Sequence, residues 1–379
     1  MAKIKQIICI SLVLLTFSTN AQNLRLGSER TASYLPLLDG KNIAIVGNQT
    51  SMITRTHLVD SLLSLEVEVV KVFSPEHGFR GEADAGAKIE DGTDVKTGLP
   101  IISLYGKNKK PLPEQLELID ILLFDIQDVG ARFYTYISTL HYLMEAAAEN
   151  SIKVIVLDRP NPNGHYIDGP IREQDFKSFV GMHPIPITHG MTIGEYAKMI
   201  IGENWISKKC DLIVIEMENY THDMHYNLPI KPSPNLPNSR SINLYPSLCL
   251  FEGTNVSVGR GTKYPFQHFG SPDLESNYNF TPKSREGSKS PKHENKECFG
   301  TDLRFQDNYL TEINLNWLIA TYSECNEKDK FFNTFFDKLA GNDKLRGQII
   351  AGGTEREIKA TWESDLINFK KIREKYLIY

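Results

Sequence analysis

The sequence predicts an α/β fold in which a doubly wound, mostly parallel sheet is joined to a second, smaller α+β domain. Short apolar runs rich in Val, Ile and Leu recur between residues 41 and 217 without polar alternation, as expected for strands that are covered on both faces. Segments with helical periodicity lie between many of these runs, and this order of elements is typical of a parallel sheet. The predicted strands are residues 43–46, 67–73, 101–104, 121–124, 154–157 and 212–215.

Two of the intervening helices can be placed from their side chains. Within residues 134–150, apolar residues from Ile137 to Ala147 recur every three or four positions and predict one buried stripe. A second helix is expected after Thr192, because Thr192 and Glu195 have the spacing of a capping box. We therefore assign Glu195 to capping and not to function.

The pattern changes after residue 217. Residues 228–246 hold five prolines and predict an extended chain, whereas the polar residues 271–297 predict a long solvated loop. Residues 303–379 mix strand-like and helical runs, which favours a smaller domain closing one side of the first. The expected division is a signal peptide at 1–21, an α/β domain at 22–235 and an α+β domain at 236–379.

The first residues have the order of a secretory signal. Lys3 and Lys5 precede an apolar run at 7–17, and small residues lead to Ala21. The run is short for a membrane span. We expect cleavage near Ala21 and an exported, periplasmic or secreted chain with no stable membrane insertion.

The composition narrows the class of partner. The chain of 379 residues has a formal net charge of −5, which becomes −7 once Lys3 and Lys5 are removed, and no Lys/Arg-rich run offsets it. Nucleic acid and anionic membranes are therefore poor partners. Of the five cysteines, four follow the signal, and we expect at most one disulfide among them. The sequence carries no signal for an oligomeric state.

Polar motifs follow five of the predicted strands. Ligands of open α/β sheets bind beyond the carboxyl ends of the strands, so these motifs predict a single cleft. Their candidate substrate-binding residues are Asn48, Arg80, Asp125, Asp128, Arg132, Tyr134, Arg159, Asn161 and Asn163. Structural alternatives stay open: Asn48 could cap a helix, Asp128 and Arg132 could form an ion pair, and the loop 158–162 could be an ordinary turn.

Several familiar motifs are missing. The first strand is followed by no GxGxxG, and the chain has no Walker pattern, GxSxG or HExxH, so we expect no cofactor. Glu76, His77, Asp125 and Asp128 could hold a divalent cation, but no spacing requires one, and we assign no metal.

Carboxylates, amides, arginines and tyrosines around a cleft suit a polar, hydroxyl-rich substrate. Hydrolysis of a glycosidic bond requires a carboxylic acid that protonates the leaving oxygen, and Glu76 is the candidate. Two alternatives are an exported, two-lobed sugar or muropeptide binding protein without turnover, and a metal-dependent esterase or deacetylase using Glu76, His77 and Asp128.

Four separated runs resemble the NamZ-type exo-β-N-acetylmuramidases, formerly a domain of unknown function. The resemblance extends from about Asn42 to the C-terminus. The runs are FSPEHGFRG (73–81), DIQDVGARFYTYISTL (125–140), LDRPNPNG (157–164) and FEGTNVSVGRGTKYPF (251–266).

The resemblance implies a Rossmann-like domain joined to a smaller one, with the active site in the cleft between them. It also implies an exo-acting hydrolase that releases N-acetylmuramic acid from the non-reducing end of peptidoglycan fragments. By position in its motif, Glu76 matches the glutamate proposed as catalytic in the family, and His77 stands beside it.

The other roles follow from the chemistry of this sugar. Its lactyl carboxylate calls for a guanidinium, and the candidates are Arg132, Arg159, Arg240 and Arg260. Hydroxyls or the N-acetyl group would be held by Asp125, Asp128, Asn161 and Asn163. Glu252 is the candidate for a second catalytic carboxyl from the other domain. Retaining, inverting and substrate-assisted courses all stay open, as does tolerance of a stem peptide.

Overall fold

The six predicted apolar runs form six of the seven strands of one sheet, and their bounds differ from the predicted ones by at most two residues. The seventh strand, at residues 92–93, was not predicted. The computed structural model describes residues 23–76, 78–80, 91–306 and 308–379, so the expected signal peptide and His77 lie outside the described residues. The strands of this sheet are β1 (Ile43–Gly47), β4 (Val69–Ser74), β5 (Gly92–Thr93), β6 (Pro100–Ser103), β7 (Ile121–Asp125), β8 (Lys153–Leu157) and β9 (Leu212–Ile215).

The strand order is β5-β6-β4-β1-β7-β8-β9, and only the β5–β6 pair is antiparallel. Without the short β5, the six parallel strands follow the Rossmann order, in which the chain reverses direction between β1 and β7. Gly47 at the end of β1 pairs with Asp125 at the end of β7, so the loops that follow these strands start side by side. The predicted fold class is confirmed.

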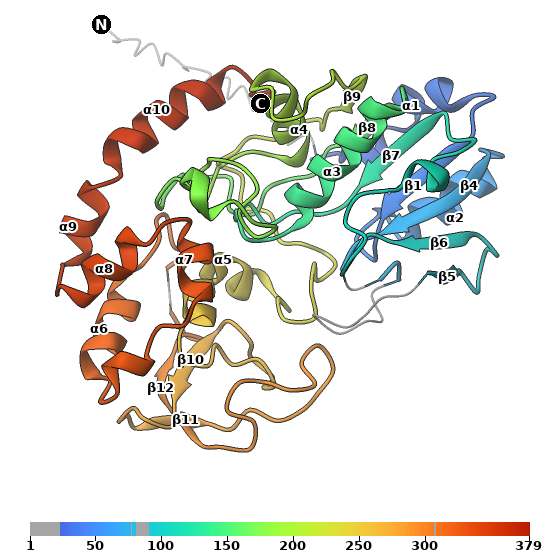
Figure 1. Ribbon diagram of the computed structural model, residues 1–379. Helices are drawn as coiled ribbons and strands as arrows, with labels where there is room; N and C mark the ends of the chain where they lie inside the picture. Colours follow the sequence, from blue (N-terminus) through green and yellow to red (C-terminus); the bar gives the residue numbers. More distant parts are fainter. Residues whose placement is uncertain (1–22, 77, 81–90, 307) are drawn as a thin grey trace, which may run out of the picture.

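The side chains of alternate strand residues pack into two separate hydrophobic cores, one on each face of the sheet. Ile43 and Ile45 of β1 pack with α1 (Thr31–Leu38) and α2 (Leu58–Ser64) on one face. Ala44 and Val46 pack with α3 (Tyr136–Glu149) and α4 (Ile193–Gly202) on the other. This alternation follows from the two-residue period of a strand, and the absence of polar residues follows because helices cover both faces (Figure 1).

Both predicted helices form. Ile137, Leu140, Met144 and Ala147 of α3 are all buried in the core. At α4 the capping box is present: the Glu195 amide donates to the Thr192 hydroxyl at 3.2 Å, and the Thr192 amide donates to the Glu195 carboxylate at 2.9 Å.

The second lobe contains a three-stranded antiparallel sheet in the order β10-β12-β11, and helices cover it (Figure 1). Its strands are β10 (His268–Ser271), β11 (Tyr278–Phe280) and β12 (Cys298–Asp302). Its helical elements are α5 (Ser239–Leu248), the 3₁₀-helix η4 (Cys249–Gly253), α6 (Asn316–Glu324), α7 (Phe335–Ala340), α8 (Lys344–Ile350), α9 (Glu355–Ala360) and α10 (Glu363–Glu374). The strand-like runs expected after residue 303 are not strands: the described strands of this lobe all precede it.

The extended chain predicted over 228–246 is wrong from Ser239 onward. Helix α5 starts at Ser239, because the Asn238 side chain accepts from the Ser241 amide at 2.9 Å and caps it. Pro246 has no N–H for the Ile242 carbonyl, one turn earlier. The Asn163 amide donates to that carbonyl at 3.1 Å and replaces the missing bond.

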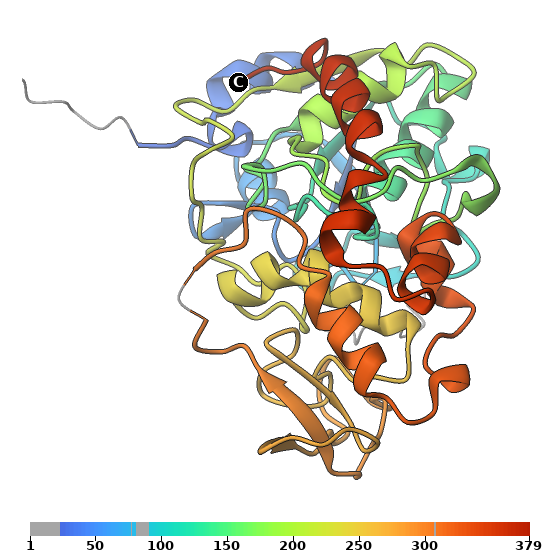
Figure 2. The same cartoon turned by 90° about the vertical axis from the view of Figure 1, so that its left-hand side faces the viewer.

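The end of the chain returns to the first lobe. Figure 2 shows α10 running along the molecule from the second lobe toward the first. The Ile378 amide donates to Glu195 at 2.9 Å, and the hydroxyl of Tyr379 donates to Asp158 at 2.9 Å. Four buried cysteines are unpaired (Cys210, Cys249, Cys298 and Cys325). None of the described helices is both long and apolar enough to cross a membrane.

Candidate active site

A pocket of about 260 Å³ lies where the polar loops of the first lobe meet the second lobe. The first lobe contributes the turn after β4, the second residue after β6 and the start of α3. The second contributes the end of α5, η4, the Gly-rich loop 259–266 and α7. Its lining residues are Glu76, Tyr105, Phe133, Tyr134, Thr135, Tyr136, Phe179, Val180, Ser233, Asn235, Leu236, Tyr245, Cys249, Glu252, Arg260, Phe266, Phe335 and Leu339.

Glu76 is the carboxylate that the first lobe supplies. It follows β4 and Pro75 directly and is partly buried. Tyr105, which follows β6, shares a hydrogen bond with it; burial, the charge of Glu76 and this bond together raise the pKa of the Tyr105 hydroxyl. Burial and the same charge raise the pKa of Tyr136. Both tyrosines are therefore neutral hydrogen-bonding groups beside an acid.

The second lobe supplies an ion pair. The Glu252 carboxylate accepts from Nε and Nη2 of Arg260, both at 2.9 Å, which is a bidentate pair. The guanidinium also lies over the ring of Phe266, 5.0 Å from its centroid. Among the described residues that line the pocket, Glu76 and Glu252 are the carboxylates and Arg260 is the cation.

Separate hydrogen bonds orient two of the pocket tyrosines. Asn48 Oδ1 accepts from the amide of Thr50 at 2.9 Å and from its hydroxyl at 2.6 Å, so Nδ2 is the atom that donates to the Tyr136 hydroxyl at 3.0 Å. The Tyr134 hydroxyl donates to the Pro232 carbonyl at 2.8 Å. The rings of Tyr134 and Tyr136 also pack edge to face, with their centroids 4.9 Å apart. Asn48 is fully buried and acts on the pocket only through Tyr136, which corrects its expected contact with substrate.

Asp125 and Arg159 are brought together, but away from the pocket. Both are buried, and Asp125 accepts from Nε and Nη2 of Arg159 at 2.6 and 2.8 Å. Arg159 Nη2 also donates to the Met52 carbonyl at 3.2 Å. The pair fastens the ends of β7 and β8 to the segment after β1, and neither residue lines the pocket, although the sequence favoured both as substrate-binding residues.

Asp128 and Arg132 form no ion pair with each other. The Arg132 guanidinium is fully buried and donates to four carbonyls: Pro170 and Ile185 of the first lobe, at 2.7 and 2.6 Å, and Leu339 and Ala340 of the second, at 2.9 and 2.7 Å. Burial lowers its pKa to about 9. This arginine joins the two lobes and does not reach a substrate carboxylate.

Asp128 lies beneath the pocket. It accepts from the Gly130 amide at 2.7 Å, and its other oxygen is buried without a hydrogen-bond partner. Burial raises the pKa of this carboxyl to about 7. The Nε2 atom of His189 lies 3.8 Å away, and burial lowers the pKa of that imidazole to about 3.

The remaining candidates also have structural partners. The Asn161 side chain accepts from the Asn163 amide at 2.8 Å and donates to the Met191 carbonyl at 2.9 Å. The Asn163 side chain donates to the Ile242 carbonyl of α5. Arg80 is paired with Asp94 and Asp60 at 2.7 and 3.2 Å. Arg240 donates to the Gln306 carbonyl. None of these side chains lines the pocket, and each is engaged by a carbonyl, an amide or a carboxylate elsewhere.

The pocket also contains residues that were not proposed from the sequence. Tyr105 and Tyr136 follow the ends of β6 and β7, where a polar or aromatic residue could have been chosen by position alone. Asn235, Tyr245 and Phe266 carry no such signal, because only the packing of the second lobe brings them to the pocket.

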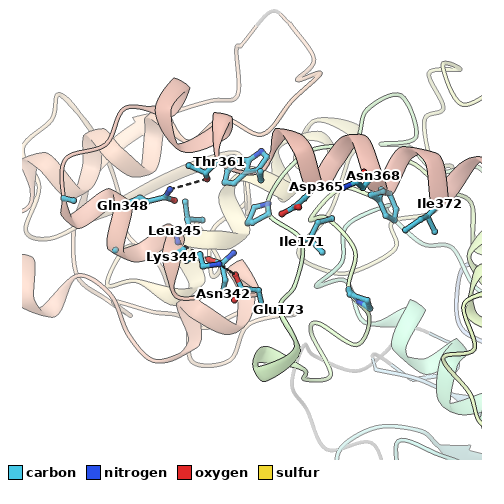
Figure 3. Close-up of a pocket in the computed structure, with 16 residues that line it drawn as sticks. Ile171, Glu173, Asn342, Lys344, Leu345, Gln348, Thr361, Asp365, Asn368 and Ile372 are labelled. Carbon is cyan, nitrogen blue, oxygen red and sulfur yellow. Dashed lines mark hydrogen bonds and ion pairs between the residues drawn. The ribbon is translucent and has the colours of Figure 1, made fainter.

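A larger cavity of about 780 Å³ lies elsewhere, between α8, α10 and the segment 170–184 (Figure 3). Its walls include Ile171, Leu345 and Ile372, and Lys344 is paired with Glu173 at 2.8 Å. None of the residues proposed from the sequence lines it. The described part of the chain contains no group of three or more His, Cys, Asp or Glu side chains that could hold a metal ion. We therefore place the candidate active site in the smaller pocket.

Comparisons with known proteins cover nearly the whole chain. The model of the N-terminal domain of exo-beta-N-acetylmuramidase NamZ matches residues 43–240, and the model of its C-terminal domain matches residues 243–379. The chain is 43% identical over 369 residues to the peptidoglycan beta-N-acetylmuramidase NamZ of Bacillus subtilis strain 168, and the match covers 91% of this chain and 89% of that protein.

Crystal structures of two DUF1343 family proteins from Bacteroides fragilis have the same fold. One is 49% identical with a TM-score of 0.88, and the other is 30% identical with a TM-score of 0.81. Each match covers 94% of this chain and 99% of the other.

Proposed function

The chain belongs to the exo-β-N-acetylmuramidase NamZ family, and from this we propose that it is a glycoside hydrolase that releases N-acetylmuramic acid from the non-reducing end of peptidoglycan fragments. The observation that carries the proposal is a single pocket that holds Glu76 from the first lobe together with the Glu252–Arg260 pair from the second.

Glu76 is the proposed general acid. A carboxylic acid beside the glycosidic oxygen protonates it as the bond to the sugar breaks, and such catalysis contributes roughly 10² to 10⁴ in rate. Tyr105 is bonded to this carboxyl and orients it. His77, which stands next in the sequence, lies outside the described residues and stays a candidate by resemblance alone.

Glu252 and Arg260 supply the proposed recognition of the lactyl group. Arg260 uses Nε and Nη2 for Glu252, which leaves Nη1 to receive the lactyl carboxylate. Glu252 holds the guanidinium in place. A neutral N-acetylglucosaminide has no carboxylate for Arg260 to bind, so it would gain little binding energy from this pair. This arrangement favours a positioning role for Glu252 over the second catalytic role expected from the sequence.

The aromatic lining suits a sugar. Tyr134, Tyr136, Tyr245 and Phe266 all line the pocket. A small pocket closed between two lobes accepts the end of a saccharide chain and not its middle, which agrees with exo action.

We also propose that the chain is exported, with a signal peptide cleaved near Ala21. The support is the order of Lys3, Lys5, an apolar run and small residues. Edman sequencing of the protein from the periplasm or the medium should start at Gln22, whereas an intact N-terminus in the cytoplasm would contradict export.

The activity is tested with a chromogenic N-acetylmuramide and the matching N-acetylglucosaminide, each with and without EDTA. We expect release from the muramide only, with no effect of the chelator. Saturable binding without release would instead identify a binding protein, and chelator-sensitive release of an acyl group would identify an esterase.

A further inference from the structure

A second hollow, of about 150 Å³, adjoins the candidate active site. Three segments line it: the proline-rich segment around residue 234, the Gly-rich loop and the turn at 285–288. Asn235 lines both the hollow and the active-site pocket, so the two spaces share a wall.

The walls of the hollow are fixed to one another. Asn235 Nδ2 donates to the Gly287 carbonyl at 2.7 Å, which joins the proline-rich segment to the turn. A Cβ atom on Gly287 would lie 2.6 Å from that of Pro234, so the two segments touch at a point where only glycine fits. The Lys283 amide donates to the Gly261 carbonyl at 2.9 Å and holds the third segment. The hollow is therefore a built feature and not a chance gap between loops.

Its charge is positive on a protein that is acidic overall. Lys231, Lys263 and Arg285 line it, against the single carboxylate of Glu286. Glu286 lies 4.0 Å from Lys231, the outer limit of an ion pair. Within the described ranges, no carboxylate lies within 4 Å of Lys263 or Arg285. Three cations held together on a chain of net charge −5 repel one another and attract an anion.

We propose that this hollow is a subsite for a carboxylate on the leaving side of the saccharide, beyond the bond that is cut. The inference rests on the proposed function. When the terminal sugar fills the pocket at Glu76, the rest of the fragment must leave through a neighbouring surface, and the hollow adjoins the pocket at Asn235. In peptidoglycan the carboxylates on this side belong either to the lactyl group of the next N-acetylmuramic acid or to its stem peptide.

Three substrates distinguish these sources. They are the disaccharide of N-acetylmuramic acid on N-acetylglucosamine, the peptide-free tetrasaccharide of two such units, and that tetrasaccharide with a stem peptide on its second N-acetylmuramic acid only. In the double variant Lys263→Gln/Arg285→Gln, we expect KM for at least one tetrasaccharide to rise about fivefold with kcat unchanged. Disaccharide kinetics should match those of the wild type. The stem peptide converts the lactyl carboxylate into an amide, so a rise confined to the peptide-free tetrasaccharide identifies the lactyl carboxylate. A rise confined to the peptide-bearing one identifies a stem-peptide carboxylate, and a rise with both shows that the hollow accepts either.

The matched control is Lys208→Gln/Lys209→Gln, which removes two exposed cations from the loop after α4. It should leave every KM unchanged. An equal rise in KM for the disaccharide, or no rise with either tetrasaccharide, overturns the proposal. If the wild type releases no sugar from any substrate, the proposed function fails. Calorimetry then tests the hollow separately, because the double variant must still bind tetrasaccharides more weakly than the wild type.

Discussion

The Nη2 atom of Arg132 in the first lobe lies 2.7 Å from the carbonyl oxygen of Ala340 in the second. The same guanidinium also holds the Leu339 carbonyl, and Leu339 lines the candidate active site. One buried side chain thus fixes the end of α7 against the sheet domain. The pocket formed between the lobes depends on this junction, although Arg132 does not enter it.

We expect Arg132→Met to destabilise the protein by about 3 kcal/mol or more, because it leaves the buried carbonyls of Pro170, Leu339 and Ala340 without a donor and removes one of two donors from that of Ile185. Urea unfolding measures the change. The control is Arg346→Met, which breaks a more exposed pair with Asp337 and should cost less than about 1 kcal/mol. Similar losses in the two variants would contradict the role of Arg132.

Glu76→Gln should lower kcat for an N-acetylmuramide roughly 10²- to 10⁴-fold, because the amide keeps the shape and removes the proton donor. The thermal midpoint should not change. Glu117→Gln, a substitution of an exposed glutamate away from the pocket, is the control and should keep full activity. A Glu76→Gln variant with near-normal kcat would show that another group is the acid.

Arg260→Ala should lower kcat/KM for the muramide about tenfold to a hundredfold, since a hydrogen bond to a charged group contributes about 1.5 to 3 kcal/mol. Activity on the glucosaminide should change much less, so the preference for muramide falls. Arg240→Ala is the matched control, because Arg240 was an equal candidate in the sequence but does not line the pocket. Unchanged preference in the Arg260 variant would rule out recognition of the lactyl group by this residue.

The sheet could be predicted from the sequence because its signal is local. Each parallel strand is a continuous apolar run, and the strand ends place Glu76 and Tyr134 at one edge of the sheet. The capping box of α4 could also be predicted from the sequence, because Thr192 and Glu195 lie three residues apart.

The roles of the other polar residues could not be predicted, because their partners lie far away in the chain. Asn163 donates to a carbonyl 79 residues away that Pro246 leaves without a donor, and Arg132 donates to carbonyls 207 and 208 residues away. The same contact between Asn163 and α5 explains why a proline-rich segment, expected to be extended, ends in a helix. In each case a buried backbone group needs a partner, and sequence spacing does not reveal that need.

The hydrogen bond from Asn48 to Tyr136 gives a further prediction. In Asn48→Asp, a carboxylate replaces the amide that donates to Tyr136, so the Tyr136 hydroxyl must donate to residue 48 instead of accepting from it. We expect KM for the muramide to rise while the fold is kept. Tyr136→Phe, which removes the same hydroxyl, should reproduce the rise, and adding Asn48→Asp to it should have little further effect. Additive effects of the two substitutions would show that Asn48 does not act through Tyr136.

The buried carboxyl of Asp128 makes stability depend on pH. Burial raises its pKa from an ordinary 3.8 to about 7, so between these values the native state holds a proton that the unfolded chain has lost. The free energy of unfolding therefore falls as pH rises through this window. His189 acts in the opposite sense: burial lowers its pKa from 6.5 to about 3, so its contribution to stability grows as pH rises between these values.

Asp128→Asn removes the first effect and keeps the second. At pH 5 the wild-type carboxyl is protonated and resembles the amide, whereas at pH 8 it is ionised and buried at a cost in free energy. The thermal midpoint of the variant, relative to the wild type, should therefore be higher at pH 8 than at pH 5. Differential scanning calorimetry at both pH values measures this, with the exposed Asp329→Asn as a control that should show no such shift. A difference between variant and wild type that is the same at both pH values would mean that Asp128 titrates alike in the folded and unfolded chains.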